Sequence, residues 1–405
     1  MPRRWIVISL DGLAGLALSP YGSSWNDTPE LDRLAASGLT WDRVIVPSEE
    51  TSETLHRCWT HRIGDQDWLQ ACRRFGRVEL IVEQSATVTT AWNELADDVG
   101  FDACTLVEPE LEPIAAEEIE STGLGQLFSA LIDRLSPDDD GSKAAAPDWA
   151  VLWLHSDLLT RHWDAPRWLF PVDRADDFEE PEDPSDPATW ESADGGGDAN
   201  TPPVAVTAPP PLWDSTTPPS LRITAADHPD TVTSWMQTYG CQVRLVDRLL
   251  SWVAEVIGRS DPDIGLAVVG TSGMALGQDG WIGHRAGPLR SPEIQVPTIL
   301  HVPGSAPLRW PYLASLVDVM PHLVPGNRLA TAASWGGTSR SGETEITTAS
   351  FRAKRAVTTD RWFYVRDLDD SSRLYLKPDD RDDVNDVANR CLDVVEGFSG
   401  SANRS

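Results

Sequence analysis

The chain has 405 residues, and its 63 acidic side chains outnumber its 33 basic ones, which gives a formal net charge of -30 at pH 7. Long-range repulsion from this charge argues against general affinity for nucleic acid or for acidic membrane surfaces. The five cysteines are scattered and form no Cys-x-x-Cys pair. We therefore expect reduced thiols in a cytoplasmic protein, and neither a disulfide framework nor a zinc site. No apolar run is long enough to cross a bilayer.

The chain opens with a run, residues 5–10, that is apolar except for Ser9 and stops at Asp11 and Gly12. Such a run predicts a strand that is buried on both faces. Ligands of open α/β sheets bind beyond the carboxyl ends of the strands. We therefore expect the Asp11 carboxylate at the rim of the sheet, where a ligand would bind.

Segment 28–38 has both a helix start and a helix stop. Thr28 can cap the helix, and Gly38 can take the left-handed conformation that often ends one. Residues 39–46 alternate apolar and polar side chains and predict a strand directly after this helix.

Further apolar runs predict core strands at 77–83, at 149–155 and from residue 264 onward. Before the last of them, apolar residues of segment 231–257 recur at gaps of four and three, which places them on one face of a long helix.

The composition changes sharply between residues 171 and 219, where acidic residues, glycines and prolines dominate. Such a segment has too little apolar surface to offset the entropy lost on ordering. We expect a disordered or loosely wrapped acidic insertion, and a docking element for a basic partner is the alternative.

Four segments carry motifs in a recognisable order: Thr28-Pro-Glu-Leu-Asp-Arg-Leu-Ala, Val269-Gly-Thr-Ser-Gly-Met, Ile294-Gln-Val-Pro-Thr-Ile-Leu and Thr359-Asp-Arg-Trp-Phe-Tyr. As a set they resemble the sulfatases of the alkaline phosphatase superfamily. The resemblance implies an α/β fold, with a mixed, mostly parallel sheet sandwiched by helices and a small C-terminal antiparallel sheet with a helix. It also implies an α/β domain at 1–334 and a C-terminal subdomain at 335–405.

The sulfatase nucleophile motif, Cys-x-Pro-x-Arg or Ser-x-Pro-x-Arg, is missing from residues 47–57, where the resemblance places it. By spacing, Glu50 or Thr51 falls near the nucleophile position, and neither can become the formylglycine that the family uses. Thr51 can attack a phosphorus centre, as the threonines of related phosphodiesterases do, if a metal lowers the pKa of its hydroxyl. The alternative is that Thr51 caps the following helix. Arg57 is the nearby guanidinium that could contact substrate.

Positions that hold metal ligands in sulfatases are replaced here. Gly12 stands where the family has the second carboxylate of an Asp-Asp pair, and Gly273 and Met274 stand where it has Asp and then His or Asn. Glycine offers no side-chain oxygen, and a thioether is a soft ligand that Ca²⁺ or Mg²⁺ would not choose. Asp11 remains, and Asp279 is a further candidate ligand. We expect either no cofactor or a single divalent cation.

Two histidines and an arginine complete the predicted site. His162 lies nearest to the family's ester-binding histidine, with His155 behind it, and a structural role at the strand end is the alternative. His284 aligns with a sulfate-binding lysine of the family, and Arg285 is next to it. These residues suggest a small anionic, sulfated or phosphorylated ligand.

The scaffold and the site give opposite indications about function. One hypothesis is a sulfatase-like protein that has lost sulfatase chemistry and has a binding or structural role, because losing a nucleophile costs several powers of ten in rate. The other is an active hydrolase of sulfate or phosphate esters that uses Thr51, or a water, in a rebuilt site. That site would contain Asp11, Glu50, Asp279, His162 and His284.

Overall fold

The structure, a computed structural model, describes residues 2–84, 92–136, 148–171, 208–261, 263–327 and 344–400. Most of the predicted acidic insertion, residues 172–207, lies outside the described residues. The boundary predicted near residue 335 also lies outside them, so the division into two domains stays a prediction.

Within the described residues, the largest sheet has eight strands in the order β13-β2-β12-β9-β1-β7-β5-β6. In that order the strands are Leu308–Ser315, Gly38–Ile45, Gln295–His301, Ile264–Gly270, Arg4–Leu10, Trp149–Ser156, Arg77–Glu83 and Ala103–Val107. The central strand β1 pairs in parallel with β7 and β9, whereas β12 runs antiparallel to both of its neighbours, β9 and β2. The predicted mixed, mostly parallel sheet is confirmed.

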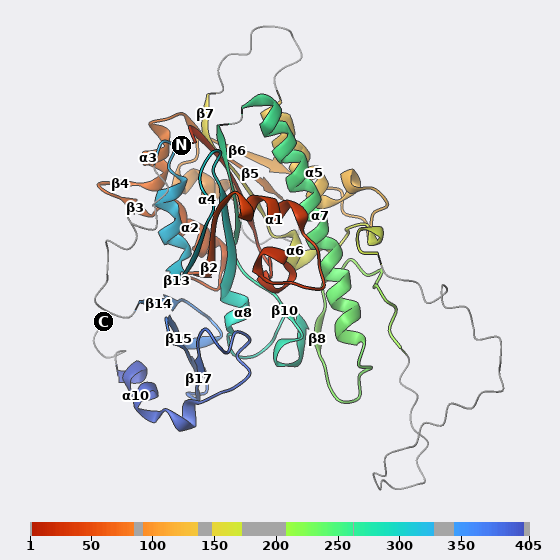
Figure 1. The fold of residues 1–405 in the computed structure, drawn as a ribbon, viewed down its shortest axis with the longest axis vertical. Coiled ribbons are helices and arrows are strands. Elements are labelled where there is room, and N and C mark those ends of the chain that lie inside the picture. The colour runs from red at the N-terminus through yellow and green to blue at the C-terminus, as the bar shows by residue number, and fades with distance from the viewer. Residues whose placement is uncertain are drawn as a thin grey trace, which may run out of the picture.

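Helices cover both faces of this sheet (Figure 1). Because successive side chains of a strand point to opposite faces, Trp5 and Val7 of β1 enter one core, and Ile6 and Ile8 enter the other. The first core is closed by α2 (Thr51–Trp59), α3 (Trp68–Arg73), α4 (Trp92–Val99) and the 3-10 helix η7 (Leu316–Leu323). The second is closed by α1 (Pro29–Ala36), α5 (Gly123–Leu135) and α7 (Thr231–Ser260).

Smaller elements surround the rim at which β1 ends. A three-stranded sheet has the order β10-β11-β8, and the C-terminal part forms a four-stranded antiparallel sheet, β14-β15-β16-β17. The bounds are α6 Leu158–Arg161, β8 Ser220–Arg222, β10 Ala275–Leu276, β11 Trp281–Gly283, α8 Ser291–Ile294, β14 Glu345–Thr348, β15 Ala353–Thr359, β16 Trp362–Asp367, β17 Ser372–Leu376 and α10 Leu392–Gly400. A short hairpin pairs β3 (Arg62–Ile63) with β4 (Gln66–Asp67).

The C-terminal sheet packs its helix through an aromatic contact and is tied to the large sheet by backbone pairing. Tyr364 stacks on Phe398 of α10, with ring centroids 5.2 Å apart. Ser48 forms a parallel bridge with Ala349, and the Thr348 hydroxyl donates to the Val46 carbonyl at 2.9 Å. The expected small antiparallel sheet with a helix is therefore confirmed, and its first loop lies against the end of β2.

Helix α1 starts and stops where the sequence predicted, with Thr28 at the N-cap position, but its ends are stabilised differently. The Thr28 side chain does not cap the helix but accepts the Ser19 N–H at 3.0 Å. The carboxylate of Asp247 on α7 accepts the N–H groups of the first turn instead. Gly38 does not take a left-handed conformation. It begins β2, and a Cβ there would lie 2.3 Å from the Leu300 carbonyl oxygen, so close approach of the neighbouring strand requires this glycine.

Among the described helices, none combines the length and the apolar character needed to cross a membrane.

Candidate functional site

A cavity of about 380 Å³ lies at the rim where β1, β2 and β9 end. Its wall is built from residues that follow these strands, from α6 and α8, from the turn around His284, and from the loop before β15. This volume lies within the range of small-molecule pockets, roughly 300 to 1,000 Å³.

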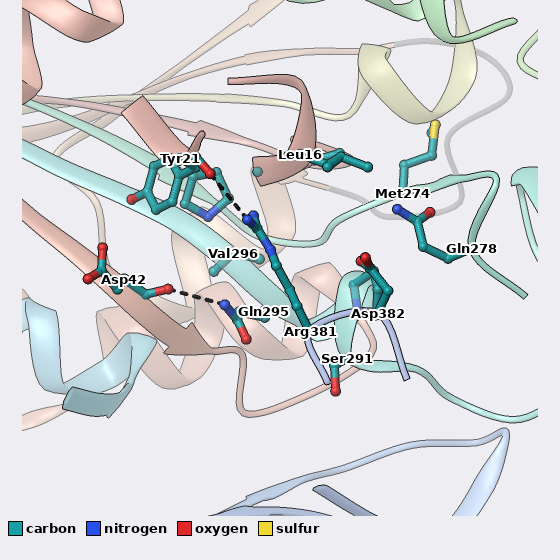
Figure 2. A pocket seen from close by; sticks show the side chains of 14 residues that line it. Leu16, Tyr21, Asp42, Met274, Gln278, Ser291, Gln295, Val296, Arg381 and Asp382 are labelled. Atoms are coloured by element: carbon teal, nitrogen blue, oxygen red, sulfur yellow. Dashed lines mark hydrogen bonds between the residues drawn. The ribbon is translucent and has the colours of Figure 1, made fainter. Parts of the chain in front are cut away.

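A second cavity shares Met274 with the first and has a volume of only about 30 Å³. Figure 2 shows Arg381 reaching across it to Tyr21, whose carbonyl accepts from the Arg381 guanidinium at 3.1 Å. Gln295 donates to the Asp42 carbonyl at 3.1 Å on another side. Because this space holds no more than a water or two, the larger cavity, beside Asp11, is the ligand-sized one of these two.

Asp11 lies in the wall of the larger cavity, as the sequence predicted for a residue directly after β1. The Thr51 hydroxyl donates to Asp11 Oδ1 at 2.7 Å, and the Thr271 hydroxyl donates to the same oxygen at 3.4 Å. The N-cap of α2 is Glu50, which makes no side-chain cap. The alternative in which Thr51 caps α2 is therefore wrong, and its hydroxyl is directed to Asp11 instead.

The two glycines that the sequence resemblance places at metal-ligand positions leave no free space for a side chain. Gly12 has a φ of +82°, and a Cβ there would lie 2.6 Å from the Thr160 methyl carbon. A Cβ on Gly273 would lie 2.0 Å from the Pro292 carbonyl oxygen, and the Gly273 N–H donates to the Glu293 carbonyl at 2.9 Å. The obstacle at Gly273 is backbone, whereas at Gly12 it is the Thr160 side chain.

Charged groups on the opposite wall are paired with one another. Arg352, from the loop before β15, forms ion pairs with Glu49 and with Glu293, the latter at 2.9 Å. Arg285 pairs with Glu293 at 3.2 Å, and burial lowers the pKa of its guanidinium. Sequence reasoning predicted only Arg285 of this group. Glu49 follows a predicted strand and Glu293 precedes a family motif, which were available signals.

Asp279 and Arg57 both form ion pairs of their own. Asp279 contacts Arg285 at 3.3 Å and Arg290 at 3.0 Å. Arg57 pairs with Glu53 at 2.6 Å, one helical turn away on α2. Neither Asp279 nor Arg57 lines the cavity. Asp279 as a metal ligand and Arg57 as a substrate contact stay predictions.

The three histidines differ in position. His284 lines the cavity, and its Nε2 lies 2.6 Å from the Thr160 carbonyl oxygen. His162 does not line the cavity; it faces Asp164 at 3.8 Å, and burial lowers the pKa of its imidazole. His155 is fully buried in β7, with Nδ1 3.0 Å from the Ser9 hydroxyl. The structure thus brings together Asp11, Thr51 and His284, but not His162.

No family model and no curated protein matches the chain. Solved structures do match over nearly the whole length. A phosphonate monoester hydrolase of Agrobacterium radiobacter has 16% identity and a TM-score of 0.62, with coverage of 99% of this chain and 95% of that one. A protein in complex with its substrate D-glucosamine-2-N,6-O-disulfate has 13% identity and a TM-score of 0.64, with coverage of 100% and 98%.

A 2-O GAG sulfatase also matches, with 11% identity, a TM-score of 0.58, and coverage of 100% of this chain and 91% of that one. The chain has a sulfatase fold. At these identities the likeness concerns the arrangement of the backbone, and the residues of the site carry the functional argument.

A sulfatase fold implies a divalent cation at the rim of β1, and the residues of this sulfatase-fold chain do not fit one. Gly12 and Gly273 supply no side-chain oxygen, and Met274 supplies a thioether; the Gly12 carbonyl oxygen already accepts the Tyr239 hydroxyl. Among the described residues, no group of three or more His, Cys, Asp or Glu side chains is arranged to hold a metal ion. A hard cation needs about six oxygen ligands, and Asp11 alone provides too few.

Proposed function

We propose that this sulfatase-fold protein binds a small ligand in the cavity beside Asp11 and does not hydrolyse sulfate or phosphate esters. The observation that carries the proposal is the packing at Gly12 and Gly273, where neighbouring atoms occupy the positions that metal-binding side chains would need. Without the cation, only the guanidinium groups that line the cavity, Arg285 and Arg352, are left among its described residues to neutralise the charge that develops on a transferring sulfuryl or phosphoryl group.

The pairing of the arginines supports the same conclusion. Arg285 and Arg352 line the cavity but already share the carboxylates of Glu49 and Glu293. To bind a sulfuryl or phosphoryl group, the arginines would have to leave these buried ion pairs, and separating a buried pair leaves an uncompensated charge. The ligand-sized space remains, so a binding role fits the geometry better than a catalytic one.

The test combines metal analysis with turnover. Purified full-length protein is analysed for divalent metals and assayed with p-nitrophenyl sulfate and p-nitrophenyl phosphate, beside Asp11→Ala and a surface control, Asp98→Ala. We expect metal well below one ion per chain and no turnover that depends on Asp11. One stoichiometric divalent ion, or turnover that is lost in Asp11→Ala and retained in Asp98→Ala, would overturn the proposal.

One contact favours a second candidate, an active ester hydrolase. The Thr51 hydroxyl is 2.7 Å from Asp11 Oδ1, so the carboxylate holds it at the rim and can accept its proton. Under this alternative, Thr51→Ser retains turnover, Thr51→Ala abolishes it, and a phosphorylated Thr51 accumulates during reaction with an aryl phosphate. Mass spectrometry of the quenched protein separates the two candidates, because a non-hydrolytic protein stays unmodified.

A further inference from the structure

The charges in the larger cavity leave one carboxylate in excess. Its wall holds three carboxylates, Asp11, Glu49 and Glu293, and two guanidinium groups, Arg285 and Arg352. Both guanidinium groups are paired with the two glutamates. Within the described residues Asp11 has hydroxyl partners only, and both bind its Oδ1. The charge that remains for a ligand is therefore the negative one on Asp11.

The neighbouring polar group also presents an acceptor. Since a carbonyl oxygen can only accept, the contact of His284 Nε2 with the Thr160 carbonyl requires the hydrogen to be on Nε2. In the neutral ring, Nδ1 then carries a lone pair and accepts a hydrogen bond from a ligand. Asp11 Oδ2, likewise, has no hydrogen-bond partner among the described residues. Both free positions suit a ligand that donates hydrogen bonds.

A largely exposed aromatic ring also lies at the cavity. Phe351 lines it and is 65% exposed, although a phenylalanine is normally buried. The loop that carries Phe351 is held in place by Arg352, whose guanidinium pairs with Glu49 and Glu293. An exposed ring on a fixed loop can cover the apolar face of a sugar and can attract a cation through its π face.

We propose that the ligand is an unsulfated amino sugar, a monosaccharide-sized polyol that carries a protonated amine. The ammonium group pairs with Asp11, a hydroxyl donates to His284, and the C–H face of the ring packs on Phe351. This assignment deepens the proposed function and depends on it, since a metal at Asp11 would occupy the same carboxylate. It also reverses the charge of the ligand that the sequence resemblance implies.

Isothermal titration calorimetry with glucosamine, glucose and glucosamine 6-sulfate tests the assignment. We expect glucosamine to bind about tenfold more tightly than glucose, the effect of one charge-assisted hydrogen bond. Glucosamine 6-sulfate should bind more weakly than glucosamine, since its sulfate would meet guanidinium groups that are already paired. In Asp11→Asn the preference for glucosamine over glucose should fall to within about twofold, whereas Asp98→Asn should keep it.

A second pair of variants tests the aromatic contact. Phe351→Leu keeps an apolar side chain but removes the ring and should weaken glucosamine binding about threefold. Phe75→Leu, at another exposed phenylalanine that does not line the cavity, should leave it unchanged. Circular dichroism and urea midpoints confirm that each variant is folded.

Three results would overturn the assignment: no glucosamine binding to the folded wild type, tighter binding of glucosamine 6-sulfate, or an unchanged glucosamine preference in Asp11→Asn. These results leave the proposed function standing, because metal content and ester turnover are separate readouts. Conversely, Asp11-dependent turnover would refute the proposed function whichever sugar binds.

Discussion

Replacing Gly273 by alanine adds a single methyl group at a point where the backbone of α8 comes close to the loop after β9. Its Cβ would lie 2.0 Å from the Pro292 carbonyl oxygen, where ordinary van der Waals contact begins near 3.4 Å. The obstacle is backbone, so the chain between β9 and α8 must move. Overpacking of this kind typically costs about 1 to 3 kcal/mol, and the size of the overlap places Gly273→Ala near the upper value.

Urea denaturation, followed by circular dichroism, measures the free energy of unfolding of Gly273→Ala. Gly258→Ala is the matched control, since nothing lies within 4 Å of a Cβ built at that position on α7, and alanine there should stabilise by up to about 1 kcal/mol. Gly273→Asp should be destabilised at least as much as Gly273→Ala and should gain no calcium binding. An unfolding free energy within about 0.5 kcal/mol of wild type for Gly273→Ala, or calcium binding by Gly273→Asp, would refute the reasoning.

Three further variants test contacts that shape the rim and its supports. Burial raises the pKa of Asp247 to about 6, so the folded state favours the protonated carboxyl group. This group therefore stabilises the fold fully below about pH 4, and the stabilisation, about 3 kcal/mol, is lost as the pH rises through 6. Asp247→Asn should therefore flatten the fall in stability between pH 4 and pH 7, and an unchanged slope would contradict this. The Tyr239 hydroxyl donates to one backbone carbonyl and accepts one backbone N–H in the loop after β1. Tyr239→Phe should cost about 1 to 3 kcal/mol in urea unfolding, and a neutral effect would show that water replaces the hydroxyl. Lys377 and Asp383 form a buried ion pair at 2.6 Å, so Lys377→Met should lower the free energy of unfolding by about 3 to 5 kcal/mol. An unchanged thermal unfolding midpoint would contradict this.

The large sheet was predictable because each of its central strands is a continuous apolar run in the sequence. Residues 5–10 are almost wholly apolar, and β1 is buried on both faces between parallel neighbours. The same run predicted where Asp11 would lie. Gly38 shows the limit of local reasoning. A glycine after a helix is typical of a left-handed cap, but here the approach of β12, more than 250 residues later, requires it.

The charged wall of the cavity could not be predicted from the sequence in the same way. Glu49 and Arg352 are 303 residues apart, and no periodicity or spacing connects them. The positions that the resemblance assigns to metal ligands were predictable in part. The sequence showed that Gly273 lacks a side-chain oxygen, whereas only the structure shows that a Cβ there would overlap the Pro292 carbonyl oxygen. The residue type at such a position can therefore be read from the sequence, whereas the packing around it cannot.

Because the loop before β15 lines the cavity, residues from both the N-terminal and the C-terminal part of the chain form its wall. Glu49 lies in the loop after β2, while its ion-pair partner Arg352 lies beyond the last strand of the large sheet. A chain cut after residue 327 would keep all eight strands of that sheet. It would nevertheless expose Asp11, Glu49 and Glu293 to one another with Arg285 as the remaining cation among the cavity's charged residues. The cut would also uncover the core that Ile346, Phe363 and Tyr375 share with the large sheet. The C-terminal sheet therefore supplies both a counter-charge for the rim and part of the apolar core beneath it.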